Sequence, residues 1–219
     1  TSPAALAEAH FLLGRAAFDQ GDFQSSISHM SEAKTLDPQK YGEQVNVLTV
    51  LSYHKLQDVN KLKETLETLQ KENPAAVSRV PDVIPAWLGL QAYGMKDLET
   101  ADKYMTWATQ NDQLQNVKKV IWRNLAKVRL ALKKYDRALV ASNNFLKVED
   151  QPYRRADGML DKASILLGLG KYAEARKTAE EALALGVEGP LMASLKIVLG
   201  DISYAEKKFD EAAKHYGVT

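Results

Sequence analysis

The sequence predicts an all-α fold, a right-handed α-superhelix of tandem antiparallel helical hairpins. Two observations lead to this prediction. First, a three-residue pattern recurs six times in the 219 residues. It consists of a small or slim residue, an aromatic or aliphatic residue nine positions later, and a small or slim residue three positions further on. Second, the copies repeat every 36 to 39 residues, which indicates one supersecondary unit copied in tandem. The copies begin at Gly14, Val50, Gly89, Ala126, Ala163 and Gly200.

The first copy reads as two helices joined by a short turn. The apolar residues Ala9, Leu13, Ala16 and Ala17 are spaced three and four positions apart, as on one face of a helix. Gly21 follows, and glycine accepts the left-handed conformation found at helix ends. A second apolar stripe starts at Phe23 and stops before Pro38, because the residue preceding a proline avoids helical dihedral angles.

The other copies follow the same order and predict a single array over residues 1–219, in which each first helix lines the concave side. The sixth copy stops before its second helix is complete, so we expect the chain to be a fragment of a longer protein. We also expect the stack to bend at Pro74–Pro85, the longest junction. The predicted repeats cover residues 7–40, 43–76, 82–115, 119–152, 156–189 and 193–219.

This pattern resembles the tetratricopeptide repeat. Ser26 and Met30 depart from it, since the family usually has an alanine and an aromatic residue there. The second copy is the least similar. The resemblance covers residues 7–219 and implies a scaffold that binds a peptide segment or partner protein in its concave groove. In the first copy, the matching residues are Leu13, Gly14, Gly21, Phe23, Ala33 and Pro38.

Composition excludes several classes of protein. The 45% of hydrophobic residues can form a core, while a net charge of +1 provides no general attraction to nucleic acid or anionic lipid. The apolar runs are far shorter than the roughly 20 residues of a membrane span, so we expect no direct membrane insertion. The absence of cysteine excludes disulfides and thiolate chemistry. It favours a bacterial periplasmic or exported protein, although cytosolic proteins also often lack cysteine.

No pattern indicates catalysis. The four histidines, His10, His29, His54 and His215, lack the spacing of a zinc site. The pair Gly168 and Gly170 resembles half of a phosphate-binding loop, but it follows a helix and occupies a repeat turn. We therefore expect no enzymatic activity, no cofactor and no metal.

Candidate partner-binding residues come from the register of the first helices. Residues 116–152 contain nine Lys and Arg against three Asp and Glu, so positive charge gathers in the fourth copy. Arginine with asparagine can hold a peptide carboxylate and its backbone amides. We expect a segment that is apolar at one end and acidic toward the fourth copy. The fifth copy reverses the charge with Asp157 and Asp161. The predicted groove consists of Leu51, Trp87, Leu90, Tyr93, Arg123, Asn124 and Lys127.

Several alternatives remain open. The basic residues of the fourth copy could form only a solubilising face, with Trp87 packed near Pro85. The array could be a regulatory or spacer part attached to a catalytic or membrane-anchored part outside this chain. RNA binding would need basic residues along the whole groove, and only one copy is basic. The incomplete sixth copy predicts an apolar edge open to self-association. Its expected residues are Leu199, Ile202, Phe209 and Ala212.

Overall fold

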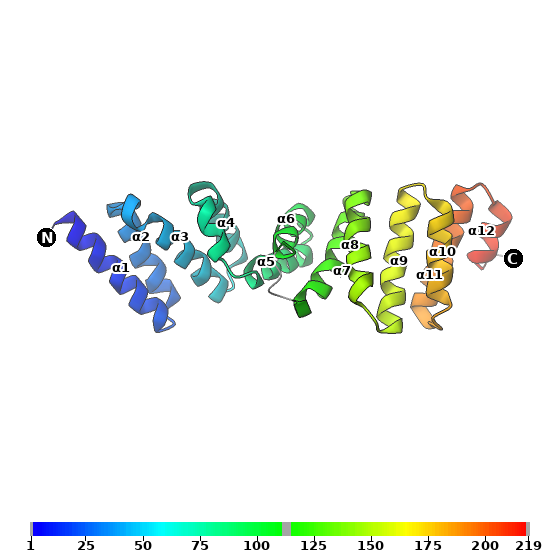
Figure 1. The fold of residues 1–219 in the computed structure, drawn as a ribbon, viewed down its shortest axis with the longest axis horizontal. Coiled ribbons are helices and arrows are strands. Elements are labelled where there is room, and N and C mark those ends of the chain that lie inside the picture. Colours follow the sequence, from blue (N-terminus) through cyan, green and yellow to red (C-terminus); the bar gives the residue numbers. More distant parts are fainter. Residues whose placement is uncertain (1, 111–114, 218–219) are drawn as a thin grey trace. The chain divides into compact units, whose positions relative to one another are not determined.

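The computed structural model describes residues 2–110 and 115–217. These contain twelve α-helices and one 3₁₀ helix, and the α-helices follow one another as antiparallel pairs (Figure 1). The first helices of the pairs are α1 (Pro3–Asp19), α3 (Pro38–Lys55), α5 (Val83–Gly94), α7 (Gln115–Ala131), α9 (Pro152–Gly168) and α11 (Gly189–Ala205). The second helices are α2 (Phe23–Leu36), α4 (Val59–Glu72), α6 (Leu98–Ala108), α8 (Tyr135–Val148), α10 (Tyr172–Leu183) and α12 (Phe209–His215). No strand occurs within the described residues, and the predicted all-α class of tandem hairpins is confirmed.

The chain divides into two compact units, residues 1–88 and 89–219, with the boundary inside α5. Unit 1 contains α1 to α4, and unit 2 contains α6 to α12. The junction Pro74–Pro85 also differs from a plain connection, because its first part forms the 3₁₀ helix η1 (Pro74–Arg79). Helix η1 was not expected from the sequence.

The hairpin turns share one backbone feature, a residue with positive φ two positions before the second helix. Glycine occupies this position at Gly21 and Gly170, with φ of 81° and 73°. The other four turns place a residue with a Cβ in the same conformation, which L-residues adopt at a cost of about 1 kcal/mol. These four are Gln57, Lys96, Lys133 and Lys207. The turn geometry is therefore retained even where glycine is not.

The second helices begin in two ways. In the first three hairpins an aspartate precedes the helix and its carboxylate accepts a backbone N–H of the first turn, which stabilises the helix start. In the last three a lysine, which cannot accept a hydrogen bond, stands at the same position. The aspartates are Asp22, Asp58 and Asp97, and the lysines are Lys134, Lys171 and Lys208.

The repeated small residues lie where the helices of a hairpin cross. A Cβ added to Gly14 would lie 3.1 Å from the side chain of Met30 on α2. At Gly89 it would lie 2.9 Å from the backbone nitrogen of Met105 on α6. The third residues of the pattern, which end with Ala212, are all buried, from 0% to 2% exposed. The two helices of each hairpin therefore approach closely at both glycines.

Each unit has its own apolar core. In unit 1 the buried side chains of Met30, Tyr41 and Leu48 form a cluster, and the ring of Phe11 stacks on Tyr41 with centroids 4.9 Å apart. In unit 2 the largest cluster joins α9, α10 and α11 through residues such as Leu195. Burying an aliphatic or aromatic side chain of this size contributes about 1.5–3 kcal/mol, so packing between hairpins holds each unit together.

Ser26 offers a test of the packing where the sequence departs from the family pattern. Its side chain is fully buried and its hydroxyl has no hydrogen-bond partner. We expect Ser26→Ala to raise the free energy of unfolding of unit 1 by about 1 kcal/mol, because the substitution removes an unsatisfied polar group. Ser52 is the control, since it is equally buried but donates to the carbonyl of Leu48 at 2.8 Å. Urea unfolding should show Ser52→Ala to be neutral or destabilising; a loss of stability in Ser26→Ala would contradict the explanation.

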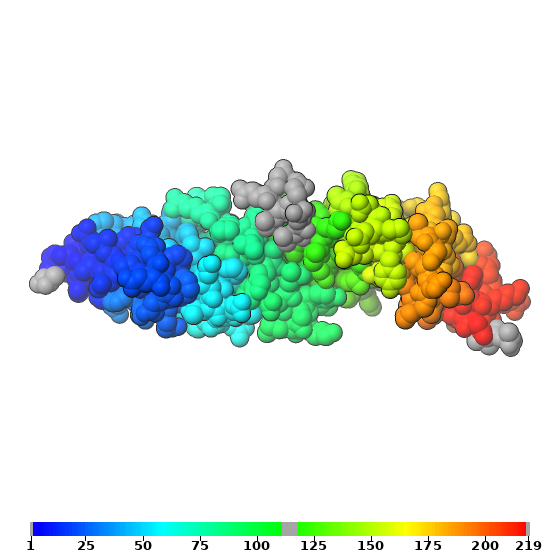
Figure 2. Space-filling view, turned by 90° about the horizontal axis from the view of Figure 1, so that it is seen from below, coloured from blue at the N-terminus to red at the C-terminus, as the bar shows by residue number. Residues whose placement is uncertain are grey.

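The expected apolar edge of the sixth copy is largely wrong. Leu199, Ile202 and Ala212 are 3%, 0% and 2% exposed, because their spacing turns them toward the hairpin interior. Phe209 is 57% exposed and its ring meets Tyr204 edge-on at 5.3 Å. Figure 2 shows α12, in red, at the surface of the C-terminal end of unit 2. Of the four predicted residues, Phe209 is therefore the exposed one, and it forms an aromatic pair with Tyr204.

Candidate functional site

The predicted groove residues of unit 1 are held by their neighbours. Leu51 is half-buried on α3 and packs against the cluster around Met30 and Tyr41. Trp87 on α5 is also half-buried, and its ring meets that of His54 edge-on at 5.5 Å. Leu51 is therefore part of the core margin, whereas Trp87 and His54 form an aromatic pair at the surface of unit 1.

The pair of His54 and Trp87 predicts a pH response. Burial, and secondarily the charge of Lys55, lowers the pKa of His54 below its usual 6.5. A lowered pKa means that the neutral imidazole is favoured in the folded state. The contribution of neutral His54 to the stability of the folded protein is therefore present above pH 6.5. It is lost as the pH falls through the lower pKa that His54 has in the folded state.

We expect the fluorescence of Trp87 to change with a midpoint below pH 6.5, as the neighbouring imidazole gains a proton. The variant His54→Gln provides the control, because glutamine does not titrate in this range. A midpoint at or above pH 6.5, or the same transition in the variant, would contradict the effect of burial. The fluorescence of Trp107 and Trp122 forms the common background in both proteins.

The remaining predicted residues belong to unit 2. Leu90 and Tyr93 are half-buried on α5. Arg123, Asn124 and Lys127 lie on α7, as the register predicted. The structure brings the last three next to α9, where Asp157 and Asp161 are found.

Arg123 is the centre of an ion-pair network between α7 and α9. Its Nη2 lies 2.5 Å from a carboxylate oxygen of Asp157, and its Nε lies 3.1 Å from Asp161. Lys127 Nζ lies 3.7 Å from the same oxygen of Asp161. The guanidinium also sits over the ring of Phe145, 5.4 Å from its centroid. The positive charge that was expected to meet an acidic partner is thus largely neutralised by carboxylates of the next hairpin.

The pKa shifts agree that this network is partly buried. Burial disfavours the charge of Arg123, but Asp161 and Asp157 more than offset it, so the pKa of Arg123 is raised. Burial also raises the pKa of Asp161, against the opposing effects of Lys127 and Arg123. Removal of either cation would therefore leave a buried carboxyl group without its compensation.

A hollow of about 350 Å³ opens beside this network, between α7 and α9 and above α8. We call it the α7–α9 hollow. Of its lining residues, Arg123, Asn124 and Asp157 were named from the sequence as facing the groove. It is lined by Lys119, Val120, Arg123, Asn124, Phe145, Glu149, Arg154 and Asp157.

The side chains that line this hollow differ in whether they already interact with other residues of the chain. Lys119 lies 3.4 Å from the carboxylate of Glu149, whose side chain is only 1% exposed. Asn124 donates to the carbonyl of Val120 at 2.9 Å. Val120 itself is 50% exposed, and Arg154 is exposed and has no ion pair within the described part of the chain. Val120 and Arg154 are therefore the groups most available to a partner.

The helix face that carries Arg123 on α7 has equivalents on the later first helices, α9 and α11. Residues 37 positions apart are equivalent in the last three hairpins, so Arg123 corresponds to Leu160 and to Ile197. Ile197 on α11 is 52% exposed. Tyr204, which is equivalent to Leu167, is 62% exposed. The apolar end of the groove was predicted to lie before Arg123, and Ile197 and Tyr204 were not predicted, although the register could have indicated them.

The described residues contain no group of three or more His, Asp or Glu side chains placed to hold a metal ion. The structure does bring together His10 and His29, whose Nδ1 atoms lie 3.1 Å apart across the first hairpin. Within residues 2–110 and 115–217, no helix is both long and apolar enough to cross a membrane.

Comparison with family models identifies the repeat at both ends of the chain. Residues 7–40 match one model described as a tetratricopeptide repeat, and residues 160–217 match another with the same description. The first segment contains most of α1 and all of α2. The second contains the C-terminal half of α9 together with α10, α11 and α12. The chain is a tetratricopeptide repeat protein.

Solved structures show the same fold at low sequence identity. PilW, a type IV pilus biogenesis factor, is 14% identical with a TM-score of 0.51, over 95% of this chain and 90% of that one. The APC/C hetero-tetramer Cut9–Hcn1 is 15% identical with a TM-score of 0.50, over 95% of this chain and 38% of that one. The structure of pilF from Pseudomonas aeruginosa is 19% identical with a lower TM-score of 0.47, over 98% of this chain and 90% of that one. No curated protein matches the sequence.

Membership of this family supports a coarse functional class. Tetratricopeptide arrays are typically non-catalytic protein-interaction scaffolds, and proteins of this kind bind protein or peptide partners. The repeats by themselves do not specify the partner.

Proposed function

We propose that this tetratricopeptide repeat protein is an interaction scaffold that binds a segment of a partner protein in the α7–α9 hollow. The observation that carries the proposal is the composition of that hollow. An exposed valine, Val120, provides apolar contact beside Arg123, whose guanidinium lies over the buried ring of Phe145 and is held by two carboxylates. A rigid apolar anchor site with a few oriented polar groups is what a partner-binding pocket requires.

The partner segment is expected to carry an apolar side chain beside an acidic one. The apolar side chain would contact Val120, and the acidic group would lie near Arg154, the exposed cation of the hollow. The acidic contact is thus proposed at Arg154 and not at Arg123 and Lys127, because these two already face Asp157 and Asp161. Extended and helical segments both meet these requirements.

Trp87, Leu90 and Tyr93 are proposed as further contacts, each within its own unit. All three are half-buried and therefore offer part of a ring or side chain to a partner. Leu51 is less suited, because it packs against the core of unit 1. Single alanine variants of the first three, compared for partner capture, would test each contribution.

The main test compares two valines that are equally exposed. Val120→Asp places a charge in the hollow, whereas Val140→Asp places it on α8, where Val140 is 56% exposed and does not line this hollow. In affinity capture from the native organism, we expect a partner bound by the wild type and by Val140→Asp to be lost with Val120→Asp. Equal capture by both variants would contradict the site. We avoid charge reversal of Arg123, because it would also break a buried network.

A further inference from the structure

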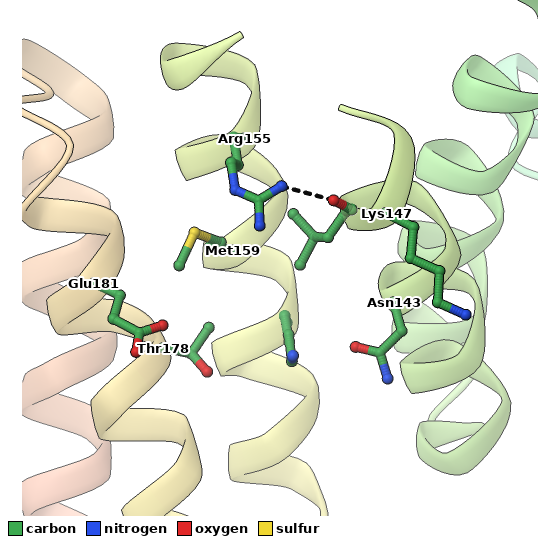
Figure 3. A pocket seen from close by; sticks show the side chains of 8 residues that line it. Asn143, Lys147, Arg155, Met159, Thr178 and Glu181 are labelled. Carbon is green, nitrogen blue, oxygen red and sulfur yellow. Dashed lines mark hydrogen bonds between the residues drawn. The ribbon is translucent and has the colours of Figure 1, made fainter. Parts of the chain in front are cut away.

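A second hollow in unit 2 lies between α8 and α10, with α9 as its floor. We call it the α8–α10 hollow. Its volume is about 600 Å³. Figure 3 shows side chains from these three neighbouring helices around it, with Lys147 on α8, Met159 on α9 and Glu181 on α10. Leu146 and Met159 supply its apolar lining.

This hollow uses a different face of α9 from the α7–α9 hollow. Arg154 and Asp157 line the α7–α9 hollow, whereas Arg155, Met159 and Lys162 line the α8–α10 hollow. Successive helix residues are rotated by about 100°, so these two sets point in clearly different directions. A partner in one hollow therefore does not occupy the other.

The charges that line the α8–α10 hollow are mostly positive. Lys147 and Lys162 make no ion pair within the described residues. Arg155 donates to the carbonyls of Leu146 and Glu149 at 2.6 and 3.0 Å, so its charge meets no carboxylate there (Figure 3 shows the first contact). Glu181 supplies the negative charge of the lining, and it is already 3.9 Å from Lys177. The hollow thus holds three cations without carboxylate partners.

An equivalent hollow in unit 1 shows a different use of charge. It lies between α2 and α4 with α3 as its floor and has a volume of about 340 Å³. Its Lys34 lies 2.7 Å from Glu72, and its Lys61 lies 3.4 Å from Glu64. Both cations that line this hollow of unit 1 are therefore paired with a carboxylate. The unpaired cations of the α8–α10 hollow therefore leave a positive field that a ligand can complement.

We propose that the α8–α10 hollow binds an acidic segment of a partner protein, with one apolar side chain over Met159 and Leu146. The acidic groups complement Lys147, Lys162 and the guanidinium of Arg155. The apolar side chain packs on Leu146, which is half-buried, and on the small exposed part of Met159. This surface is separate from the proposed α7–α9 site, so the two proposals stand or fall independently.

The test uses a fluorescein-labelled twelve-residue peptide of Asp and Glu with one central leucine, titrated in a fluorescence-anisotropy assay at low salt. The double variant Lys147→Glu/Lys162→Glu is compared with Lys196→Glu/Lys214→Glu. The latter pair is exposed on the sixth hairpin and produces the same change in net charge. We expect the first variant to weaken binding by at least about tenfold and the control by less than about threefold, because only the first reverses charges inside the hollow.

Equal weakening by both variants would mean general charge attraction and would overturn the proposal, as would no binding by the wild type. A peptide with serine in place of leucine should bind more weakly than the original. Equal binding of the two peptides would contradict the proposed apolar contact with Met159 and Leu146. Circular dichroism and urea unfolding confirm that each variant is folded.

Discussion

Replacing Arg129 by alanine is expected to lower the free energy of unfolding of unit 2 by about 3–5 kcal/mol, the cost of breaking a buried ion pair by removing one partner. Arg129 Nε lies 2.9 Å from Asp102, and their side chains are only 7% and 6% exposed. The same guanidinium donates to the carbonyl of Arg137 and to the hydroxyl of Thr106. Its removal leaves the buried carboxylate of Asp102 on α6, and the part-buried acceptors of Thr106 and Arg137, without this donor.

Asp102 would then be the most destabilised group. Burial opposes the ionised form of Asp102, but hydrogen bonds from Arg129 and Lys134 outweigh burial and lower its pKa. The carboxylate is therefore charged at neutral pH and would lose its principal partner. Lys134, whose Nζ lies 2.9 Å from Asp102, is more exposed and compensates only in part.

Arg137 is the matched control for this experiment. Its guanidinium lies 3.8 Å from the same carboxylate, but its side chain is 57% exposed. Exposed pairs contribute about 0–1 kcal/mol, so Arg137→Ala should change the urea midpoint only slightly. A similar effect for Arg129→Ala and Arg137→Ala would show that burial does not determine the strength of this network.

The variant Gly89→Ala is expected to destabilise unit 2 by about 1–3 kcal/mol, the usual cost of overpacking a filled core. The added Cβ would lie 2.7 Å from Cγ of Met105 and 2.9 Å from its backbone nitrogen. Met105 is fully buried, and a helix backbone cannot shift as readily as the end of a flexible side chain. Strain must therefore appear where α5 crosses α6.

Gly94, on the same helix, provides the control. A Cβ added there meets nothing within 4 Å. Gly94→Ala should therefore be neutral or slightly stabilising, since alanine has the higher helix propensity. Thermal unfolding of both variants checks the prediction, and equal melting temperatures would contradict the proposed contact with Met105.

The local structure could be predicted from the sequence because it depends on neighbours along the chain. Helical spacing, the glycine of the turn at Gly21 and the proline at Pro38 each act within a few residues. Because the sequence pattern is repeated, the same hairpin is predicted six times along the chain. For this reason the unusual second copy could be placed by spacing, and α3 and α4 occur there.

The candidate site could be predicted only in part, because it depends on how helices turn toward one another. The register put Arg123 and Asp161 on the same face but could not show that their side chains meet at 3.1 Å. Phe145 came from a second helix, which had been assigned to the opposite side. The pairing of His10 with His29 likewise joins residues 19 positions apart, outside any sequence motif.

Ser26 and Leu199 illustrate two further limits. The family pattern identified Ser26 as a departure, but only burial shows that its hydroxyl lacks a partner. Leu199 was expected at an open edge because the sixth copy is short. The hairpin nevertheless closes over it, since even the seven-residue α12 covers this side of α11.

The most direct test of the proposed function is site-specific photo-crosslinking at Val120 and at Val140. The two side chains are 50% and 56% exposed, so a photoreactive amino acid at either position meets solvent to a similar extent. If a partner binds in the α7–α9 hollow, it will be crosslinked through position 120 and not through position 140. Crosslinking at position 140 alone, or with equal yield at both positions, would contradict a binding site in that hollow.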